Sequence, residues 1–179
     1  MVVLKKILDF YINSSLHVAL SAFALVSMTQ YFFGVQGDFS VAFFAFFGTV
    51  VGYNFVKYDA IARLNKTEIK KELKAIVFLS FISLLACFYF FLQLSWESKL
   101  SAVAFFGLTL LYTLPFFPNK QNARNWKGVK IYIVGITWVG VTVILPLVEA
   151  EIPFKMDVLL MALQRFLLVF SIVLVFDIV

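Results

Sequence analysis

The polar residues best suited to chemistry lie just after long apolar stretches of the sequence. Asp59 and Asp177 each follow such a stretch, and Asn54 lies five residues before Asp59. Carboxylates at the ends of two neighbouring helices suit Mg²⁺, which prefers oxygen ligands and shares its coordination shell with phosphates. Lys120 and Arg124 follow another apolar stretch and are suited to the remaining phosphate charge. The set predicts a site for a phosphorylated ligand, although ordinary basic loops and helix-end acids give the same pattern.

The elements that position these residues are predicted to be membrane helices. The 179 residues are 63% hydrophobic and 14% charged, which excludes a soluble globule because such proteins are nearer half apolar and a quarter charged. A bilayer core needs roughly 17 to 20 apolar helical residues, and the apolar runs do not alternate as the strands of a barrel would. We predict a single all-α polytopic membrane domain over 1–179. Its six spans are 14–33, 39–55, 76–94, 100–117, 131–148 and 158–176.

The distribution of basic residues predicts the orientation of these spans. Twelve of the 15 Lys and Arg residues fall before the first span or in the second and fourth connections. Such an excess marks the cytoplasmic side, so we expect the amino terminus and the basic loops to be cytoplasmic. The basic balance is therefore a topology signal, and no nucleic-acid partner is expected.

Two residues inside the spans need an account of their own. Arg165 interrupts the sixth span, and a buried cation in a bilayer is costly, so its side chain is expected to face the bundle interior or a wet cavity. The sequence leaves open whether it binds substrate or a structural carbonyl or hydroxyl. Pro146 is expected to end the fifth span, because proline interrupts helical hydrogen bonding.

The second span carries two further patterns. Its glycines, Gly48 and Gly52, predict close approach of another helix. Its aromatic cluster is expected to face lipid, with the lining of a pocket for an isoprenoid tail as the alternative. The cluster consists of Phe43, Phe44, Phe46 and Phe47.

Three patches of the sequence resemble the UbiA family of intramembrane prenyltransferases, in particular a divergent bacterial branch. Tyr53-Asn54-Phe-Val-Lys-Tyr-Asp59 occupies the place of that family's first Asn-Asp-x-x-Asp motif. Leu111-Tyr112-Thr-Leu-Pro-Phe-Phe-Pro118, with the basic loop and the helix start at Ile131, is similar to the fourth and fifth helices. The approach from Arg165 to Asp177 looks like that to the second aspartate motif.

The resemblance implies transfer of an isoprenoid chain from a polyprenyl diphosphate to a lipid or aromatic acceptor in the bacterial inner membrane. Mg²⁺ held by aspartates would bind the diphosphate, a chemistry that suits a metal ion and basic residues. By position, Asp177 and Asp59 would serve the metal and Asn54 would complete the catalytic set. The residues expected on the diphosphate are Lys120, Arg124 and Arg165.

The chain departs from the family pattern at the first motif. Phe55 and Tyr58 stand where the two aspartates would be, and Asp59 is one residue late, a rotation of about 100° on a helix. The family has about nine helices, so the resemblance also predicts that these six belong to a longer protein. The alternative function is a non-catalytic UbiA-like protein that binds membrane lipid or a partner.

Overall fold

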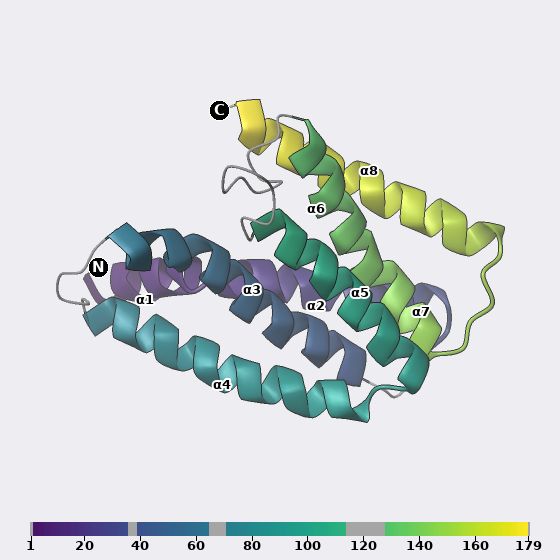
Figure 1. Ribbon diagram of the computed structural model, residues 1–179, viewed down its shortest axis with the longest axis horizontal. Coiled ribbons are helices and arrows are strands. Elements are labelled where there is room, and N and C mark those ends of the chain that lie inside the picture. Colours follow the sequence, from purple (N-terminus) through teal and green to yellow (C-terminus); the bar gives the residue numbers. More distant parts are fainter. Residues whose placement is uncertain (1, 36–38, 65–70, 114–127, 179) are drawn as a thin grey trace. The chain divides into compact units, whose positions relative to one another are not determined.

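The described parts of the chain fold almost entirely as helices (Figure 1). The computed structural model describes residues 2–35, 39–64, 71–113 and 128–178, with the backbone alone at 2, 59–64, 71–72 and 176–178. The described part contains helices and no strand, which confirms the all-α prediction. The elements are α1 Val2–Asn13, α2 Leu16–Phe32, α3 Ser40–Leu64, α4 Lys71–Gln93, α5 Trp96–Thr113, α6 Val129–Val139, a π-helical segment Gly140–Ile144, α7 Leu145–Glu149 and α8 Met156–Ile178.

Several of these helices match the length and composition of membrane spans. Four stretches qualify among the described residues, and α1 with α2 makes a fifth if this pair, bent by 60°, is counted as one span. α5 is not in this set, and the predicted span 100–117 ends outside the described residues. The coarse prediction of a helical membrane protein agrees with this finding. The four stretches are Ser40–Tyr58, Leu73–Gln93, Val129–Glu149 and Met156–Val175.

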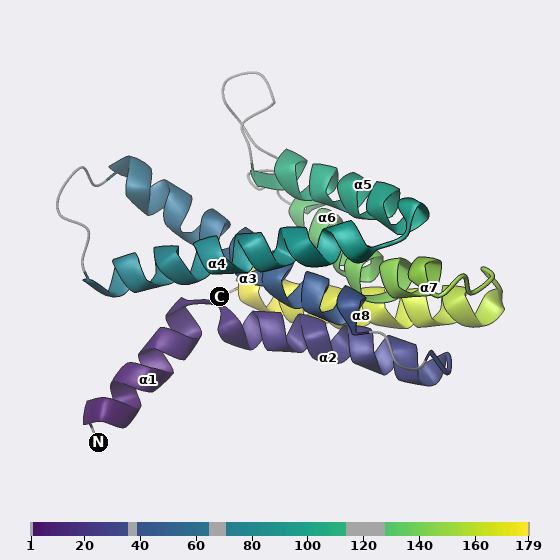
Figure 2. The same cartoon turned by 90° about the horizontal axis from the view of Figure 1, so that it is seen from below.

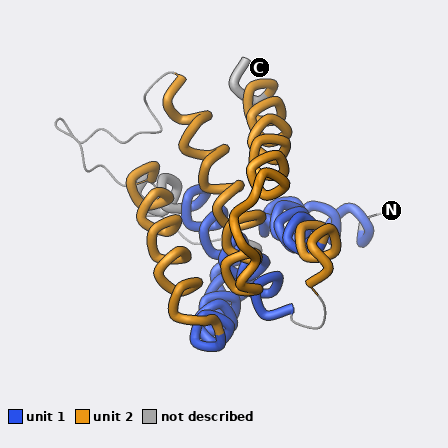
Figure 3. Tube along the Cα trace, turned by 90° about the vertical axis from the view of Figure 1, so that its right-hand side faces the viewer, with its two compact units in different colours: residues 1–27, 39–93 blue, residues 28–38, 94–179 orange. Residues whose placement is uncertain are grey.

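The helices belong to two compact units (Figure 3). The first unit comprises residues 1–27 and 39–93, and the second comprises residues 28–38 and 94–179. The boundary passes through α2, whose last turns belong to the second unit. The prediction of a single domain over 1–179 stays a prediction.

In the first unit, α3 and α4 pack through aromatic rings. The ring of Phe43 stacks on that of Phe90 with centroids 5.2 Å apart, and Phe44 lies 6.1 Å from Phe91. Aromatic pairs at such distances contribute beyond the area that they bury. The cluster predicted on the second span is therefore partly a helix-packing surface, although Phe43 remains partly exposed.

The two glycines of α3 differ in their surroundings. A Cβ added at Gly48 would lie 3.6 Å from the sulfur of Cys87 on α4, which is ordinary van der Waals contact. A Cβ at Gly52 would meet nothing within 4 Å. Of the predicted close-approach pair, only Gly48 lies against a described neighbouring helix.

The break between α1 and α2 is a bend at two buried serines, Ser14 and Ser15. Ser15 has a φ of 61°, the left-handed conformation that commonly terminates a helix. At the end of α1, the backbone carbonyl of Asn13 accepts hydrogen bonds from the Lys57 ammonium at 3.3 Å and the Tyr58 hydroxyl at 2.8 Å. These donors from α3 satisfy a carbonyl that has no partner within its own helix. Figure 2 shows α1 turning away from the axis of α2.

In the second unit, the prediction that Pro146 ends the fifth span is wrong. The helix continues from α6 through the π-helical segment into α7, which contains the proline. Because proline has no N–H, the carbonyl four residues earlier, that of Thr142, loses its α-helical donor. The hydroxyl of Thr29 donates to this carbonyl at 2.7 Å. A wider turn and a side-chain donor therefore let the helix pass the proline.

The core of the second unit lies beside this irregular helix. Val143, Leu147 and Val158 are fully or almost fully buried there. At the end of α7, the carboxylate of Glu149 accepts a hydrogen bond from the backbone N–H of Ser95 at 3.0 Å. A negative charge at the start of α5 is favourable because the N-terminal end of a helix is positive. These contacts join α5, α7 and α8 around one apolar core.

Candidate functional site

Asn54 lies on α3, about one turn before the end of the candidate span Ser40–Tyr58, and is only 3% exposed. Its amide nitrogen donates to the hydroxyl of Ser80 on α4 at 2.9 Å, and Ser80 donates in turn to the carbonyl of Ile76. Within the described part of the chain, its amide oxygen has no hydrogen-bond partner. A buried acceptor left without a donor costs free energy, so this oxygen is a candidate contact for water or a ligand.

A second buried polar atom lies one turn further along α4. Ser83 is 1% exposed, and its hydroxyl also lacks a partner among the described residues. Ser80 and Ser83 are three residues apart and therefore share a face of the helix. The first unit thus pairs Asn54 with Ser80 between α3 and α4, and the described atoms without a partner on these two helices include the amide oxygen of Asn54 and the hydroxyl of Ser83.

The residues that replace the two aspartates of the resembled motif have other surroundings. Phe55 is an exposed apolar side chain, as expected for a residue that contacts lipid. Tyr58 donates to the carbonyl at the end of α1, which is a structural contact. Neither side chain offers a carboxylate to a metal ion.

The structure does not describe the side chains of four other residues predicted at this site. Asp59 lies near the end of α3 and Asp177 near the end of α8, but both side chains are outside the described residues. Lys120 and Arg124 fall in 114–127, which the structure does not describe. The gathering of these four residues around Asn54 therefore stays a prediction.

Arg165 is buried within the second unit, near the middle of α8. It is 4% exposed and lies about 14 Å along the helix axis from Met156. Its guanidinium donates to the Thr29 hydroxyl at 3.4 Å, and Thr29 donates to the Thr142 carbonyl. The predicted interior position is confirmed, and the contact with a hydroxyl matches the structural alternative. A role on the diphosphate stays a prediction.

Sequence reasoning missed Thr29, which connects the arginine with the irregular helix. The available signal was Pro146, because a proline within an apolar run leaves one carbonyl without a donor. Which residue supplies the replacement donor depends on a contact between residues 113 positions apart. No local pattern in the sequence contains that pairing.

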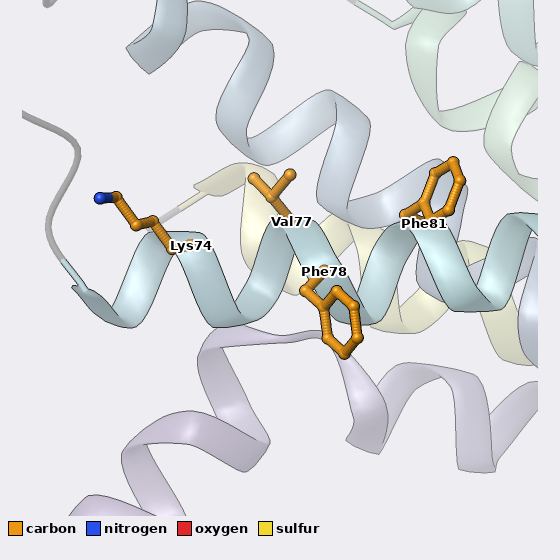
Figure 4. A pocket seen from close by; sticks show the side chains of 4 residues that line it. All are labelled: Lys74, Val77, Phe78 and Phe81. Atoms are coloured by element: carbon orange, nitrogen blue, oxygen red, sulfur yellow. The ribbon is translucent and has the colours of Figure 1, made fainter.

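A shallow hollow of about 370 Å³ runs along α4. Its described lining is Lys74, Val77, Phe78 and Phe81, all from this one helix. In Figure 4, Phe78 points to the opposite side of the helix from Val77 and Phe81. These side chains do not converge on a common point, so the hollow is a surface feature rather than an enclosed ligand site.

No set of three or more His, Cys, Asp or Glu side chains within the described ranges is arranged to hold a metal ion. No family model, curated protein or solved structure matches the chain. The similarity to the UbiA family therefore rests on the three sequence patches alone.

Proposed function

We propose that the chain forms six membrane spans in a bacterial inner membrane, with its amino terminus and basic loops in the cytoplasm. The described helices supply four to five of these spans. Twelve of the 15 basic residues fall on the side assigned to the cytoplasm, as the positive-inside rule requires. This topology brings the ends of α3 and α8 to the cytoplasmic side, together with the 114–127 connection.

At this face we propose the binding of an isoprenoid diphosphate and transfer of its chain to a lipid or aromatic acceptor. The observation that carries the proposal is the buried, unpaired amide oxygen of Asn54, in the motif position of a UbiA-like site. In the reaction, the bond between the first isoprenoid carbon and the diphosphate oxygen breaks. A bond from that carbon to the acceptor forms, and the acceptor loses a proton to the departing diphosphate. Lys120 and Arg124 bind the departing diphosphate, and an apolar surround excludes water from the reactive chain.

The described residues do not by themselves form a Mg²⁺ site. Asn54 offers one oxygen of the kind that Mg²⁺ accepts, but Phe55 and Tyr58 replace the carboxylates that the resemblance would require. A metal ion would neutralise diphosphate charge. Asp59 and Asp177 would have to supply the carboxylates that hold such an ion.

A second candidate function is non-catalytic binding of membrane lipid by a UbiA-like fold. Two observations favour it. Phe55 is exposed, as a lipid-facing residue would be, and the hydroxyl of Tyr58 on α3 bonds to the end of α1. In this function Phe55 contacts lipid and Tyr58 holds two helices together, and neither residue binds a metal ion. The two candidates share a lipid site and differ in whether the diphosphate bond is broken.

Binding at the proposed face is tested with radiolabelled geranylgeranyl diphosphate and the full-length protein in lipid nanodiscs. We expect saturable binding that weakens by more than about tenfold when Lys120 and Arg124 are both changed to Gln, because each loses a charge-assisted hydrogen bond. The matched control is Lys99→Gln with Lys155→Gln, on the opposite side of the proposed topology. Equal weakening by the two pairs, or no saturable binding, would contradict the proposed site.

A further inference from the structure

The amino-terminal helix α1 has a broad apolar face that its own unit leaves exposed. At 100° per residue, its polar side chains occupy an arc of roughly 100°, and apolar residues occupy the remainder. Leu4 is 73% exposed and Ile7 is 61% exposed. The polar arc consists of Lys5, Lys6, Asp9 and Asn13.

The contacts of α1 fix the level of its carboxyl end. Asn13 is held by Lys57 and Tyr58, near the end of the apolar stretch of α3. Tyrosine and lysine are typical of the boundary between hydrocarbon and headgroups. Because charged residues follow Tyr58 at Asp59 and Arg63, we expect the end of α1 to lie at the level of this boundary.

The bend fixes the direction of α1. Its axis makes an angle of 60° with that of α2, and the bend is stabilised by the buried, left-handed Ser15. If α2 crosses the membrane with the usual tilt of about 20°, the axis of α1 makes an angle of about 40–80° with the bilayer normal. The upper part of this range brings α1 close to the membrane plane, where a helix at the level of the headgroups meets the bilayer surface along its length.

We propose that α1 is an interfacial anchor that lies in the headgroup region, with its apolar face in the acyl boundary. The occupant of that face is lipid, because α1 is already held at the height of the interface and its apolar arc exceeds half of the circumference, as in helices that lie in a membrane plane. Lys5 and Lys6 at the edges of the polar arc suit anionic headgroups. This inference rests on the membrane topology in the proposed function and not on the proposed prenyl transfer.

The test is a spin-label accessibility scan of the full-length protein in vesicles of phosphatidylcholine and phosphatidylglycerol. Single cysteines are placed in a Cys87→Ser background at Leu4 and Ile7 on the apolar arc and at Lys6 and Asp9 on the polar arc. A label at Leu85, an exposed residue of α4, gives the reference for contact with lipid. Each labelled protein must elute as the unlabelled one does, which controls for folding.

We expect labels at Leu4 and Ile7 to resemble Leu85, with high accessibility to oxygen and low accessibility to a water-soluble nickel complex. Labels at Lys6 and Asp9 are expected to show the opposite order. High accessibility of all four labels to the nickel complex would place α1 in water. High accessibility of all four labels to oxygen, with low accessibility to nickel, would make α1 part of a broken span. Shielding of Leu4 and Ile7 from both reagents would mean that protein covers the face. Each of these three results would overturn the proposal.

Discussion

Replacing Gly140 by alanine is expected to lower the free energy of unfolding by about 1–3 kcal/mol, the range for an overpacked core. Gly140 begins the π-helical segment and is buried against α5. A methyl group at this position would overlap the edge of the Phe105 ring, which has to move. The measurement is reversible unfolding of the purified protein in mixed detergent micelles.

The control for this substitution is Gly107→Ala on α5 of the same unit, where an added Cβ meets nothing within 4 Å. It is expected to be neutral or slightly stabilising, because alanine favours helix more than glycine. In a Phe105→Ala background, where the ring is absent, Gly140→Ala is expected to cost much less than it does in the parent protein. A Gly140→Ala protein as stable as the Gly107→Ala protein would show that this close approach does not constrain the fold.

Changing Thr29 to valine is expected to destabilise the second unit by about 1–3 kcal/mol, the cost of leaving buried polar groups unsatisfied. Valine keeps the shape of threonine but lacks the hydroxyl that donates to Thr142 and accepts from Arg165. The Thr142 carbonyl then has neither the proline N–H nor the hydroxyl. Unfolding in the same detergent system measures the effect.

A matched variant separates this role from a general effect of removing a hydroxyl. Thr137→Val removes a hydroxyl that bonds to Ile133 in its own helix, and it is expected to cost little. Pro146→Ala restores an N–H four residues after Thr142, so Thr29→Val is expected to be less harmful in that background. If the cost of Thr29→Val is the same with and without Pro146, the hydroxyl is not replacing the missing donor.

The all-helical class was predictable because uninterrupted apolar runs satisfy backbone groups in lipid only as helices. The interior position of Arg165 was predictable for the same reason, since a charge facing lipid is costly. The continuation of the helix through Pro146 was not predictable, because the compensating donor, Thr29, lies on a different helix. Local rules describe what a proline removes, and tertiary contacts determine what replaces it.

The amino-terminal segment shows a different gap in the sequence reasoning. In the sequence, Lys5 and Lys6 were interpreted as signals of topology only. The helical period of about 3.6 residues also places them on one side of residues 2–13, which predicts an amphipathic helix there. The left-handed residue that separates α1 from α2 is a serine instead of the usual glycine. With no glycine or proline at the bend, the apolar run from Ser14 was predicted as a span without the preceding helix.

The residue types of the candidate site and their places near helix ends were predictable. The contacts between their side chains were not. The burial of Asn54 follows from its position within an apolar span, but its bond to Ser80 depends on the register of α3 against α4. The register is set by contacts such as the stacking of Phe43 on Phe90, which the apolar pattern alone does not specify. The arrangement of Asp59, Asp177, Lys120 and Arg124 stays a prediction of the topology.

Prenyl transfer is tested by turnover of a labelled polyprenyl diphosphate in membranes that contain the full-length protein, with and without Mg²⁺. We expect Mg²⁺-dependent transfer of the label to an extractable lipid. Asp177→Asn should reduce it by about 100-fold or more, the scale for losing one group that stabilises transition-state charge. Asp157→Asn, at the other end of α8, should leave it unchanged. No transfer with any common chain length would contradict the enzyme function and leave lipid binding as the role of the fold. Equal rates of transfer for the Asp177 and Asp157 variants would contradict the role of Asp177.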